Sequence, residues 1–244
     1  MRIMPAVAVS MFMFCSETES KAGAITPNCT CTNPVFVTSN TNGGWGNGGY
    51  YVHNNMWNAS SGETLYACAY NNWYVTATFP DTTAVKTYPN VHKDINNLKG
   101  APLKNYHNIT STFAAGSPQI GIYDVSYDVW LNGVAKAGST ELMIWTENYK
   151  QTPLGKIQAQ ANFDGVTYNV YHFTGKGANV ITLVPTDVMT SGNLNLKAIF
   201  DWAGSKGWMP SNPTINQICY GVEICSTKNQ PATFCFTDFS VTMK

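Results

Sequence analysis

Short stretches in which apolar and polar residues alternate follow one another along most of the chain. Successive side chains of a strand point to opposite faces, so this period-two pattern predicts β-strands with one buried face. Clusters of Gly, Asn, Asp and Pro separate the stretches and mark turns and loops, for example over residues 40–49 and 94–107. The predicted strands cover residues 34–38, 50–57, 65–79 (a hairpin with its turn at residues 71–72), 85–91, 109–114, 122–131, 139–145, 156–163, 166–174, 179–184, 214–225 and 233–243.

One segment has a helical pattern instead. Apolar residues recur at helical spacing from Leu196 to Ala203. Asn193 or Asn195 could cap the start of this helix, and Gly207 would end it. No repeat, low-complexity segment or linker divides the chain, so the elements together predict a single all-β domain of two packed sheets with one helix outside.

One short stretch carries an unusual combination of side chains. Glu141, Met143 and Trp145 share one face of a predicted strand, while Leu142 and Ile144 share the other. A carboxylate in the middle of a strand beside a large aromatic ring is costly unless water, a partner or a substrate meets it. A sugar-binding cleft would supply all three, whereas the alternative is an edge strand on which Glu141 is simply solvated.

The composition of the chain narrows the kind of ligand. Only 11% of the residues are charged, aromatic residues make up 13%, and the formal net charge is zero. An average domain has roughly 25% charged residues. Nothing therefore points to nucleic acid or a membrane surface as a partner. A neutral polar surface with many aromatic rings fits an uncharged polysaccharide, and we expect the protein to act as a monomer.

The first residues are typical of a secretion signal. Arg2 supplies a positive charge, residues 3–14 form an apolar run too short to cross a bilayer, and residues 22–24 (Ala-Gly-Ala) match a cleavage site. We therefore predict that residues 1–24 are removed, and that residues 25–244 form the mature domain of a secreted protein.

Cysteine usage agrees with export to an oxidising compartment. The leader would remove one of seven cysteines and leave six, an even number suited to disulfides. Cys225 and Cys235 flank a turn-rich stretch and could bridge a hairpin, and Cys68 would then pair with Cys29 or Cys31. A metal site at Cys29 and Cys31 is the rival interpretation, but their spacing is too short and no histidine is near. We predict no metal and no cofactor.

Two glutamates emerge as candidate catalytic acids by elimination. Of the four in the mature chain, Glu63 lies in a predicted turn and Glu147 lies where a strand runs into a loop. Glu141 and Glu223 lie inside strong strands, each beside residues suited to a concave sheet face. Cleavage of a glycosidic bond needs such a pair, one to protonate the leaving oxygen and one to attack or to activate water.

Asp128 is a third candidate. Its strand is joined to the Glu141 strand by a short connection, so the two acids are plausible neighbours. Acids in contact share protons, and the pKa of one rises. A protonated Asp128 could donate a hydrogen bond to Glu141 and orient it, whereas the alternative is that Asp128 binds a loop amide.

Other hydrolase chemistries find no support. The chain has no G-x-S-x-G motif, and its four histidines lie in unrelated contexts. We expect His92 and His107, which lie in or beside loops, to be solvated. A cysteine nucleophile is not expected where the cysteines form disulfides.

Several motifs together resemble glycoside hydrolase family 12, the small endoglucanases with a β-jelly-roll fold. The resemblance implies a sandwich of two antiparallel sheets with a concave substrate cleft. It also implies a retaining endo-β-1,4-glucanase, a cellulase whose substrate is a β-glucan. The motifs occur in the family's order: residues 54–57 (Asn-Asn-Met-Trp), 85–88 (Val-Lys-Thr-Tyr), 126–130 (Ser-Tyr-Asp-Val-Trp), 141–145 (Glu-Leu-Met-Ile-Trp), 153–155 (Pro-Leu-Gly) and 221–223 (Gly-Val-Glu).

The resemblance also implies a role for individual residues. Glu141 would be the nucleophile, Glu223 the general acid/base and Asp128 the helper of the nucleophile. A tryptophan taken alone is more often a core residue, but the family match favours sugar contact. The implied substrate-binding residues are Asn55 and Trp57 on the non-reducing side, Met143 and Trp145 beside the nucleophile, and Pro153 and Gly155 in a loop bordering the cleft.

The preferred substrate stays open at this point. Residues 224–227 depart from the aromatic-containing, Gly-rich stretch that many family members carry after the general acid. The alternatives are cellulose or mixed-linkage glucan, a xyloglucan-specific endoglucanase that needs a wider cleft, and a non-catalytic carbohydrate-binding protein on the same scaffold. The last needs aromatic residues but not two facing carboxylates.

Overall fold

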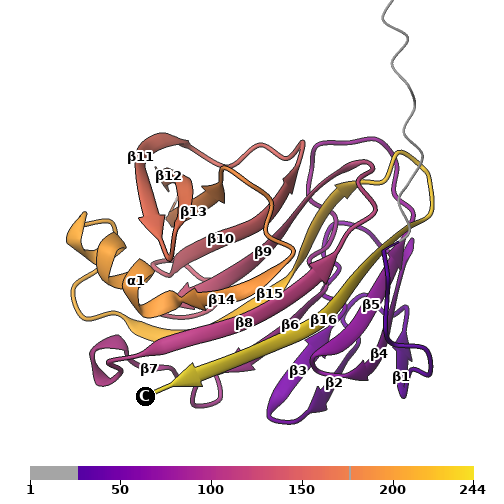
Figure 1. Cartoon of the computed structure of the whole chain (residues 1–244), viewed down its shortest axis with the longest axis horizontal. Helices are drawn as coiled ribbons and strands as arrows, with labels where there is room; N and C mark the ends of the chain where they lie inside the picture. Colours follow the sequence, from indigo (N-terminus) through magenta and orange to yellow (C-terminus); the bar gives the residue numbers. More distant parts are fainter. Residues whose placement is uncertain (1–26, 176) are drawn as a thin grey trace, which may run out of the picture.

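The computed structural model describes residues 27–175 and 177–244, so the predicted secretion signal lies outside the described residues. The regular structure of the described chain is mostly β-strand, with one short α-helix (Figure 1). Its elements are β1 (Phe36–Thr38), β2 (Gly44–Asn47), β3 (Tyr50–His53), β4 (Glu63–Ala69), β5 (Asn72–Ala77), β6 (Asn90–Asp94), β7 (Ala101–Pro102), a 3₁₀ turn (Leu103–Asn105), β8 (Ile109–Gly116), β9 (Ile122–Leu131), β10 (Thr140–Tyr149), β11 (Lys156–Phe163), β12 (Val166–Gly175), β13 (Ala178–Pro185), β14 (Ser191–Asn195), α1 (Leu196–Ser205), β15 (Thr214–Ser226) and β16 (Ala232–Met243).

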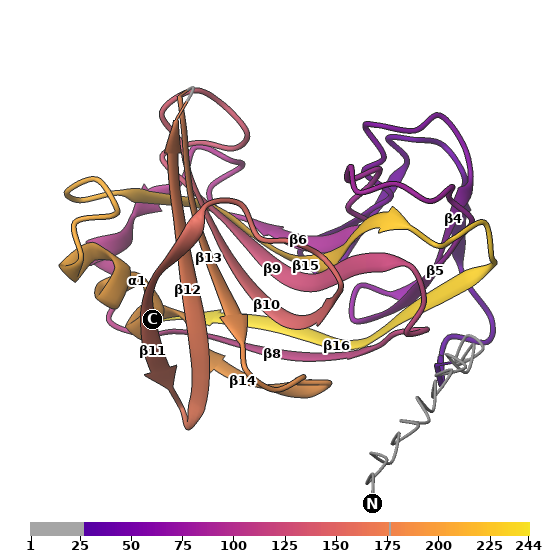
Figure 2. The ribbon, with the colours of Figure 1, turned by 90° about the horizontal axis from the view of Figure 1, so that it is seen from above.

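Two sheets pack against each other and confirm the predicted β-jelly-roll. The smaller sheet has the strand order β1-β4-β5-β16-β8-β14. The larger has the order β11-β12-β13-β10-β9-β15-β6-β3-β2, with β7 paired to β15. Every pair of neighbours is antiparallel except β10 and β13, which run parallel. In Figure 2, β11–β13 stand nearly upright at one side of the larger sheet, and β8, β14 and β16 of the smaller sheet lie below β9, β10 and β15.

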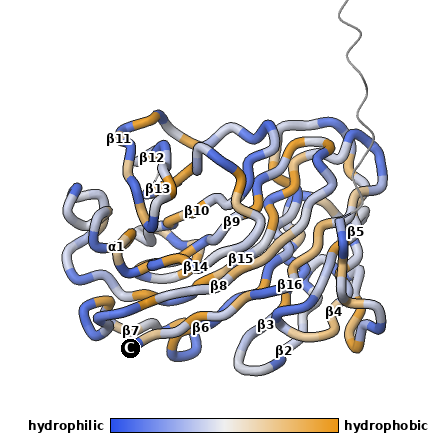
Figure 3. The backbone as a smooth tube through the Cα atoms, in the orientation of Figure 1, coloured by the Kyte–Doolittle hydropathy of each residue, from blue (hydrophilic) through white to orange (hydrophobic). Residues whose placement is uncertain are grey.

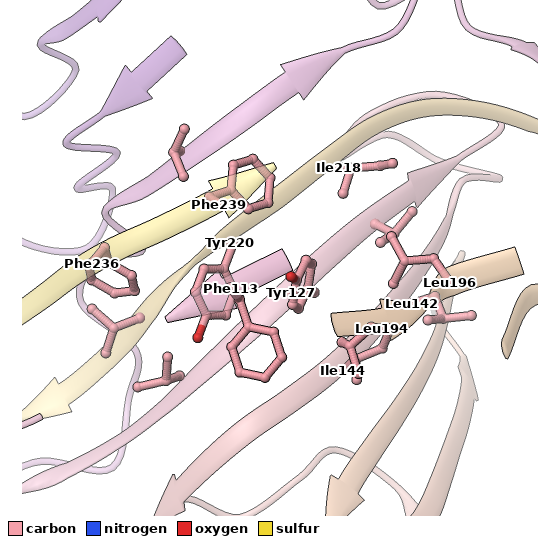
Figure 4. Packing of buried hydrophobic residues seen from close by; sticks show 14 of the residues in the cluster. Phe113, Tyr127, Leu142, Ile144, Leu194, Leu196, Ile218, Tyr220, Phe236 and Phe239 are labelled. Carbon is pink, nitrogen blue, oxygen red and sulfur yellow. The ribbon is translucent and has the colours of Figure 1, made fainter. Parts of the chain in front are cut away.

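The core lies between the sheets. In Figure 4, Phe113 and Phe239 from the smaller sheet pack against Tyr127 and Tyr220 from the larger one. The Tyr127 and Tyr220 rings are 4.6 Å apart, and each phenol has a hydrogen-bond partner. Burying one such side chain contributes about 1.5–3 kcal/mol. Because this face of β9, β10 and β15 is fixed in the core, their alternate side chains must point to the concave face.

Hydrophobic and hydrophilic residues are interspersed along the strands (Figure 3). This pattern agrees with strands that have one face in the core and one face outside it. The strands predicted at residues 156–163 and 166–174 are β11 and β12, which pair as a hairpin with its turn at Asp164 and Gly165. The predicted helix is α1, which lies beside β14. Asn195, one of the two candidates, caps it by accepting a hydrogen bond from the Ala198 amide at 3.1 Å. No helix among the described residues is long and apolar enough to span a membrane.

The disulfides differ from one expectation. Cys31 pairs with Cys68, one of the two pairings considered. Cys235 pairs with Cys29, so the predicted Cys225–Cys235 bridge is wrong. The reason is that β15 and β16 belong to different sheets, and the turn between them does not close a hairpin. Two described cysteines, both on β15, remain thiols.

Other local predictions also need correction. Glu63 does not lie in a turn but begins β4, where it is buried. His92 is not solvated, because it lies in β6 and is only 8% exposed. The strand predicted at residues 85–91 begins only at Asn90. Upstream, Thr87 makes isolated bridges to Met56 and Ile224 instead of joining a continuous ladder.

Candidate active site

Strand β9 lies between β10 and β15 and brings the acidic residues together. On β10, Met143 lies opposite Asp128 of β9, and Glu141 lies two positions away on the same face. On β15, Glu223 lies directly opposite Asp124 of β9. The side-chain period of two places all of these groups on the concave face, because the intervening residues are fixed in the core.

Two cavities meet at the predicted catalytic acids. The smaller cavity has a volume of about 580 Å³, and Met143 and Trp145 form part of its wall. The larger cavity has a volume of about 720 Å³, and Asp128 forms part of its wall. Glu141 and Glu223 line both. The two glutamates therefore face a common space, and neither is sealed within the core between the sheets.

Burial changes the acidity of both glutamates. Desolvation raises the pKa of Glu141 to about 7. Desolvation and the neighbouring charge of Glu141 raise the pKa of Glu223 to about 7, against the opposing effect of a hydrogen bond with Asp124. A pair of carboxyl groups that share a site cannot both ionise easily. One ionised and one protonated carboxyl near neutral pH is the state that a nucleophile and a general acid require.

Asp128 lies beside Glu141 in an enclosed position. It is buried, and its Oδ1 atom has no hydrogen-bond partner among the described residues. Burial, followed by the charge of Glu141, raises the pKa of Asp128 well above its usual range. The Trp130 side chain, two residues along β9, opposes this rise by hydrogen bonding to Asp128. The role of Asp128 as helper of Glu141 stays a prediction.

The comparisons with known proteins agree with this geometry. The sequence profile of glycosyl hydrolase family 12 matches residues 48–244. The chain belongs to this family. The match confirms the resemblance noted in the sequence and makes the protein a glycoside hydrolase. A search of curated protein sequences found no match.

Solved structures share the fold over most of the chain. The xyloglucanase domain of NopAA, a type three effector from Sinorhizobium fredii in complex with cellobiose, has 28% identity and a TM-score of 0.78, and the match covers 87% of this chain and 100% of that one. The native family 12 xyloglucanase from Bacillus licheniformis has 24% identity and a TM-score of 0.75, with 86% and 100% coverage. Endoglucanase cel12A from Rhodothermus marinus has 22% identity and a TM-score of 0.76, with 86% and 99% coverage.

The predicted substrate-binding residues of this family 12 hydrolase lie on both sides of the acids. Trp57 is 55% exposed and lines the larger cavity with Asn55. Asn55 adopts a positive φ of 44°, and its side-chain Nδ2 donates to the Tyr88 backbone carbonyl at 3.3 Å. Met143 and Trp145 are buried at the wall of the smaller cavity. An exposed indole in a cavity wall is suited to stacking on a sugar ring.

The loop after β10 borders the smaller cavity, as the resemblance implies. Gln151, Thr152 and Leu154 are its lining residues. Pro153 and Gly155 belong to the same loop, one on each side of Leu154, but they do not line the cavity. Gly155 has a φ of +92°, and a Cβ atom there would come within 2.7 Å of the His172 carbonyl oxygen. The contact of Pro153 and Gly155 with substrate stays a prediction.

Several cavity residues were not identified from the sequence. Gln217 donates to Asp94 at 2.8 Å, and His92 bonds Asn90 at 3.0 Å within the larger cavity. Burial, followed by the nearby His92, lowers the pKa of His53 to about 4. The far end of the larger cavity therefore presents imidazoles, amides and the Asp94 carboxylate, all of which can bond sugar hydroxyls. Asn90, His92 and Asp94 alternate along β6, whereas His53 on β3 and Gln217 on β15 join them only through strand pairing. The sequence pattern therefore shows only part of this cluster.

Asp124 is the other residue that sequence analysis passed over. It lies on the same face of β9 as Asp128, four residues earlier, so the alternation alone could have included it. Within the described chain, no group of three or more His, Cys, Asp or Glu side chains is arranged to hold a metal ion.

Proposed function

We propose that this family 12 member is a secreted endo-β-1,4-glucanase that acts with retention of anomeric configuration. Glu141 attacks the anomeric carbon while Glu223 gives its proton to the leaving glycosidic oxygen. Water then attacks the glycosyl-enzyme, Glu223 accepts a proton from it, and Glu141 is released. Asp128 assists by orienting Glu141 before each attack.

One observation carries this proposal. Glu141 and Glu223 line the same two cavities from strands on either side of β9, and burial raises the pKa of each to about 7. A carbohydrate-binding protein without activity would need the aromatic wall but not this pair of acids. The cellobiose bound by the related effector domain supports a β-glucan as the ligand class.

The test is to compare wild type with Glu141→Gln and Glu223→Gln. Reducing-sugar release from a soluble β-glucan should fall by more than about 10³-fold in each variant, because each loses one chemical role. Circular dichroism and the thermal midpoint should match those of wild type. Turnover within a few-fold of wild type in either variant would remove that residue from its role. Proton NMR of the first product anomer tests retention, and an inverted anomer would refute the double displacement.

A xyloglucan-specific endoglucanase is the second candidate. Two of the similar structures are named xyloglucanases, one of them at 28% identity, and the larger cavity of about 720 Å³ offers room beside a glucan chain. Initial rates on carboxymethylcellulose, mixed-linkage glucan and xyloglucan decide between the two. A rate on xyloglucan at least tenfold above the others would establish the second candidate.

Secretion is part of the proposal and has a separate test. N-terminal sequencing of the protein recovered from culture medium should begin at Ile25. Recovery of the intact chain inside the cells would contradict the predicted signal.

A further inference from the structure

Asp124 presents an unusual problem of hydrogen bonding. Its side chain is 0% exposed, and neither carboxylate oxygen has a hydrogen-bond partner of normal geometry in the described chain. The Ser126 hydroxyl, two residues along β9, faces it and opposes the rise of the Asp124 pKa. An ionised carboxylate left in this condition would lose its hydration without compensation. A buried carboxyl group of this kind is therefore expected either to be protonated or to share a hydrogen bond with another acidic group.

The group opposite Asp124 is itself a carboxyl. Glu223 is its register partner across the β15–β9 ladder, and the side chains of directly opposed residues point to the same face. Two ionised carboxylates can only accept, so they cannot bond each other. One proton between them turns the pair into a donor and an acceptor.

The surroundings favour retention of that proton. The other acids near the pair are Glu141 from β10 and Asp128 from β9. The thiol of Cys225 and the phenol of Tyr88 also lie near, and neither is a cation. Two cations also lie on this side of the sheet: Lys150 lines the smaller cavity with Glu223, and Lys86 lies near Cys225. Among the described residues, neither forms an ion pair with Asp124 or Glu223. Burial and the charge of Glu223 raise the pKa of Asp124 well above its usual range.

We propose that Asp124 is a positioning residue for Glu223, to which its protonated carboxyl donates a hydrogen bond throughout the reaction. This inference rests on the proposed function, in which Glu223 is the general acid/base. When Glu223 gives its proton to the leaving oxygen, the new carboxylate receives the Asp124 hydrogen bond. Asp124 keeps its own proton in both steps. The arrangement parallels that of Asp128 and Glu141, so one strand supports both catalytic glutamates.

The kinetic test uses variants that differ only in whether they can donate. Asp124→Ala and Asp124→Val cannot donate, so ionised Glu223 loses a stabilising hydrogen bond and its pKa rises. In the pH dependence of kcat/KM, the apparent pKa of the alkaline limb should then be higher by about one pH unit. Asp124→Asn keeps an N–H donor, so its limb should stay within about 0.3 unit of wild type. A limb that is unchanged in both non-donor variants, or that moves downward, would overturn the proposal.

Two further measurements keep the test decisive. Glu147→Gln is the matched control, since Glu147 is buried in the same sheet on its core face and accepts from Tyr123 and Ser117. It should leave the limb in place. Infrared difference spectra at pH 7 between wild type and Asp124→Asn should show the loss of a protonated carboxyl band. Loss of an ionised carboxylate band would overturn the proposal even if the non-donor variants do not fold. Wild type that releases no sugar from glucan would refute the proposed function, whereas the infrared result would still decide the state of Asp124.

Discussion

Replacing Glu63 by glutamine should stabilise the protein, and the gain should grow as the pH rises. The Glu63 side chain is 3% exposed; its Oε1 atom accepts from the Thr87 hydroxyl at 2.8 Å, and its Oε2 atom has no partner. Burial raises the pKa of this carboxyl from 4.5 to about 8. Glutamine keeps an oxygen for Thr87 and never ionises.

The sign follows from proton linkage. Between pH 4.5 and about 8 the unfolded chain ionises Glu63 while the folded protein keeps it protonated. Unfolding then releases a proton, so the free energy of unfolding of wild type falls as the pH rises. The shift of about 3.5 units (8 − 4.5) corresponds to an upper bound of about 4 kcal/mol at pH 8 and about 3 kcal/mol at pH 7. Below pH 4.5 this contribution disappears.

Urea unfolding of wild type and Glu63→Gln at pH 4.5, 6, 7 and 8 measures the difference directly. The variant should be within about 1 kcal/mol of wild type at pH 4.5 and more stable by about 2–4 kcal/mol at pH 8. Asp187→Asn, at an exposed carboxyl, controls for the change of charge itself. A stability difference for Glu63→Gln that does not change with pH would refute the argument that Glu63 is buried as the neutral acid.

Three further predictions concern the cleft and its support. Trp57→Ala should raise KM for glucan by about 3- to 10-fold, with less effect on kcat and on the thermal midpoint, because its ring is exposed in the cavity wall; an unchanged KM would remove it from substrate contact. Asp128→Ala should lower kcat by about 10- to 100-fold with KM nearly constant, through loss of one hydrogen bond to Glu141; wild-type kcat would contradict its role. Replacing both Cys29 and Cys235 by serine should lower the free energy of unfolding by about 2–4 kcal/mol in urea, since this disulfide spans 206 residues; equal stability would show that the bridge adds nothing.

The sequence by itself determined the class of fold and the main catalytic candidates. Strict alternation over residues 122–131 gave the same bounds as β9, because a strand with one face in the core must keep period two. Helical spacing and an asparagine cap located α1 for a similar reason, since both signals lie within a few neighbouring residues. Glu141 and Glu223 stood out as acids within strong strands, and their specific motifs carried the family resemblance.

Only the tertiary structure decided which distant residues meet. The pairing of Glu223 with Asp124, the burial of Glu63 under Thr87 and the Cys29–Cys235 bridge all join segments far apart in the chain. A local pattern shows which side chains share a face, but it does not show which strand lies beside which, or in what register. Those choices depend on how the two sheets pack as a whole, and they set the acidity of the carboxyl groups in the cleft.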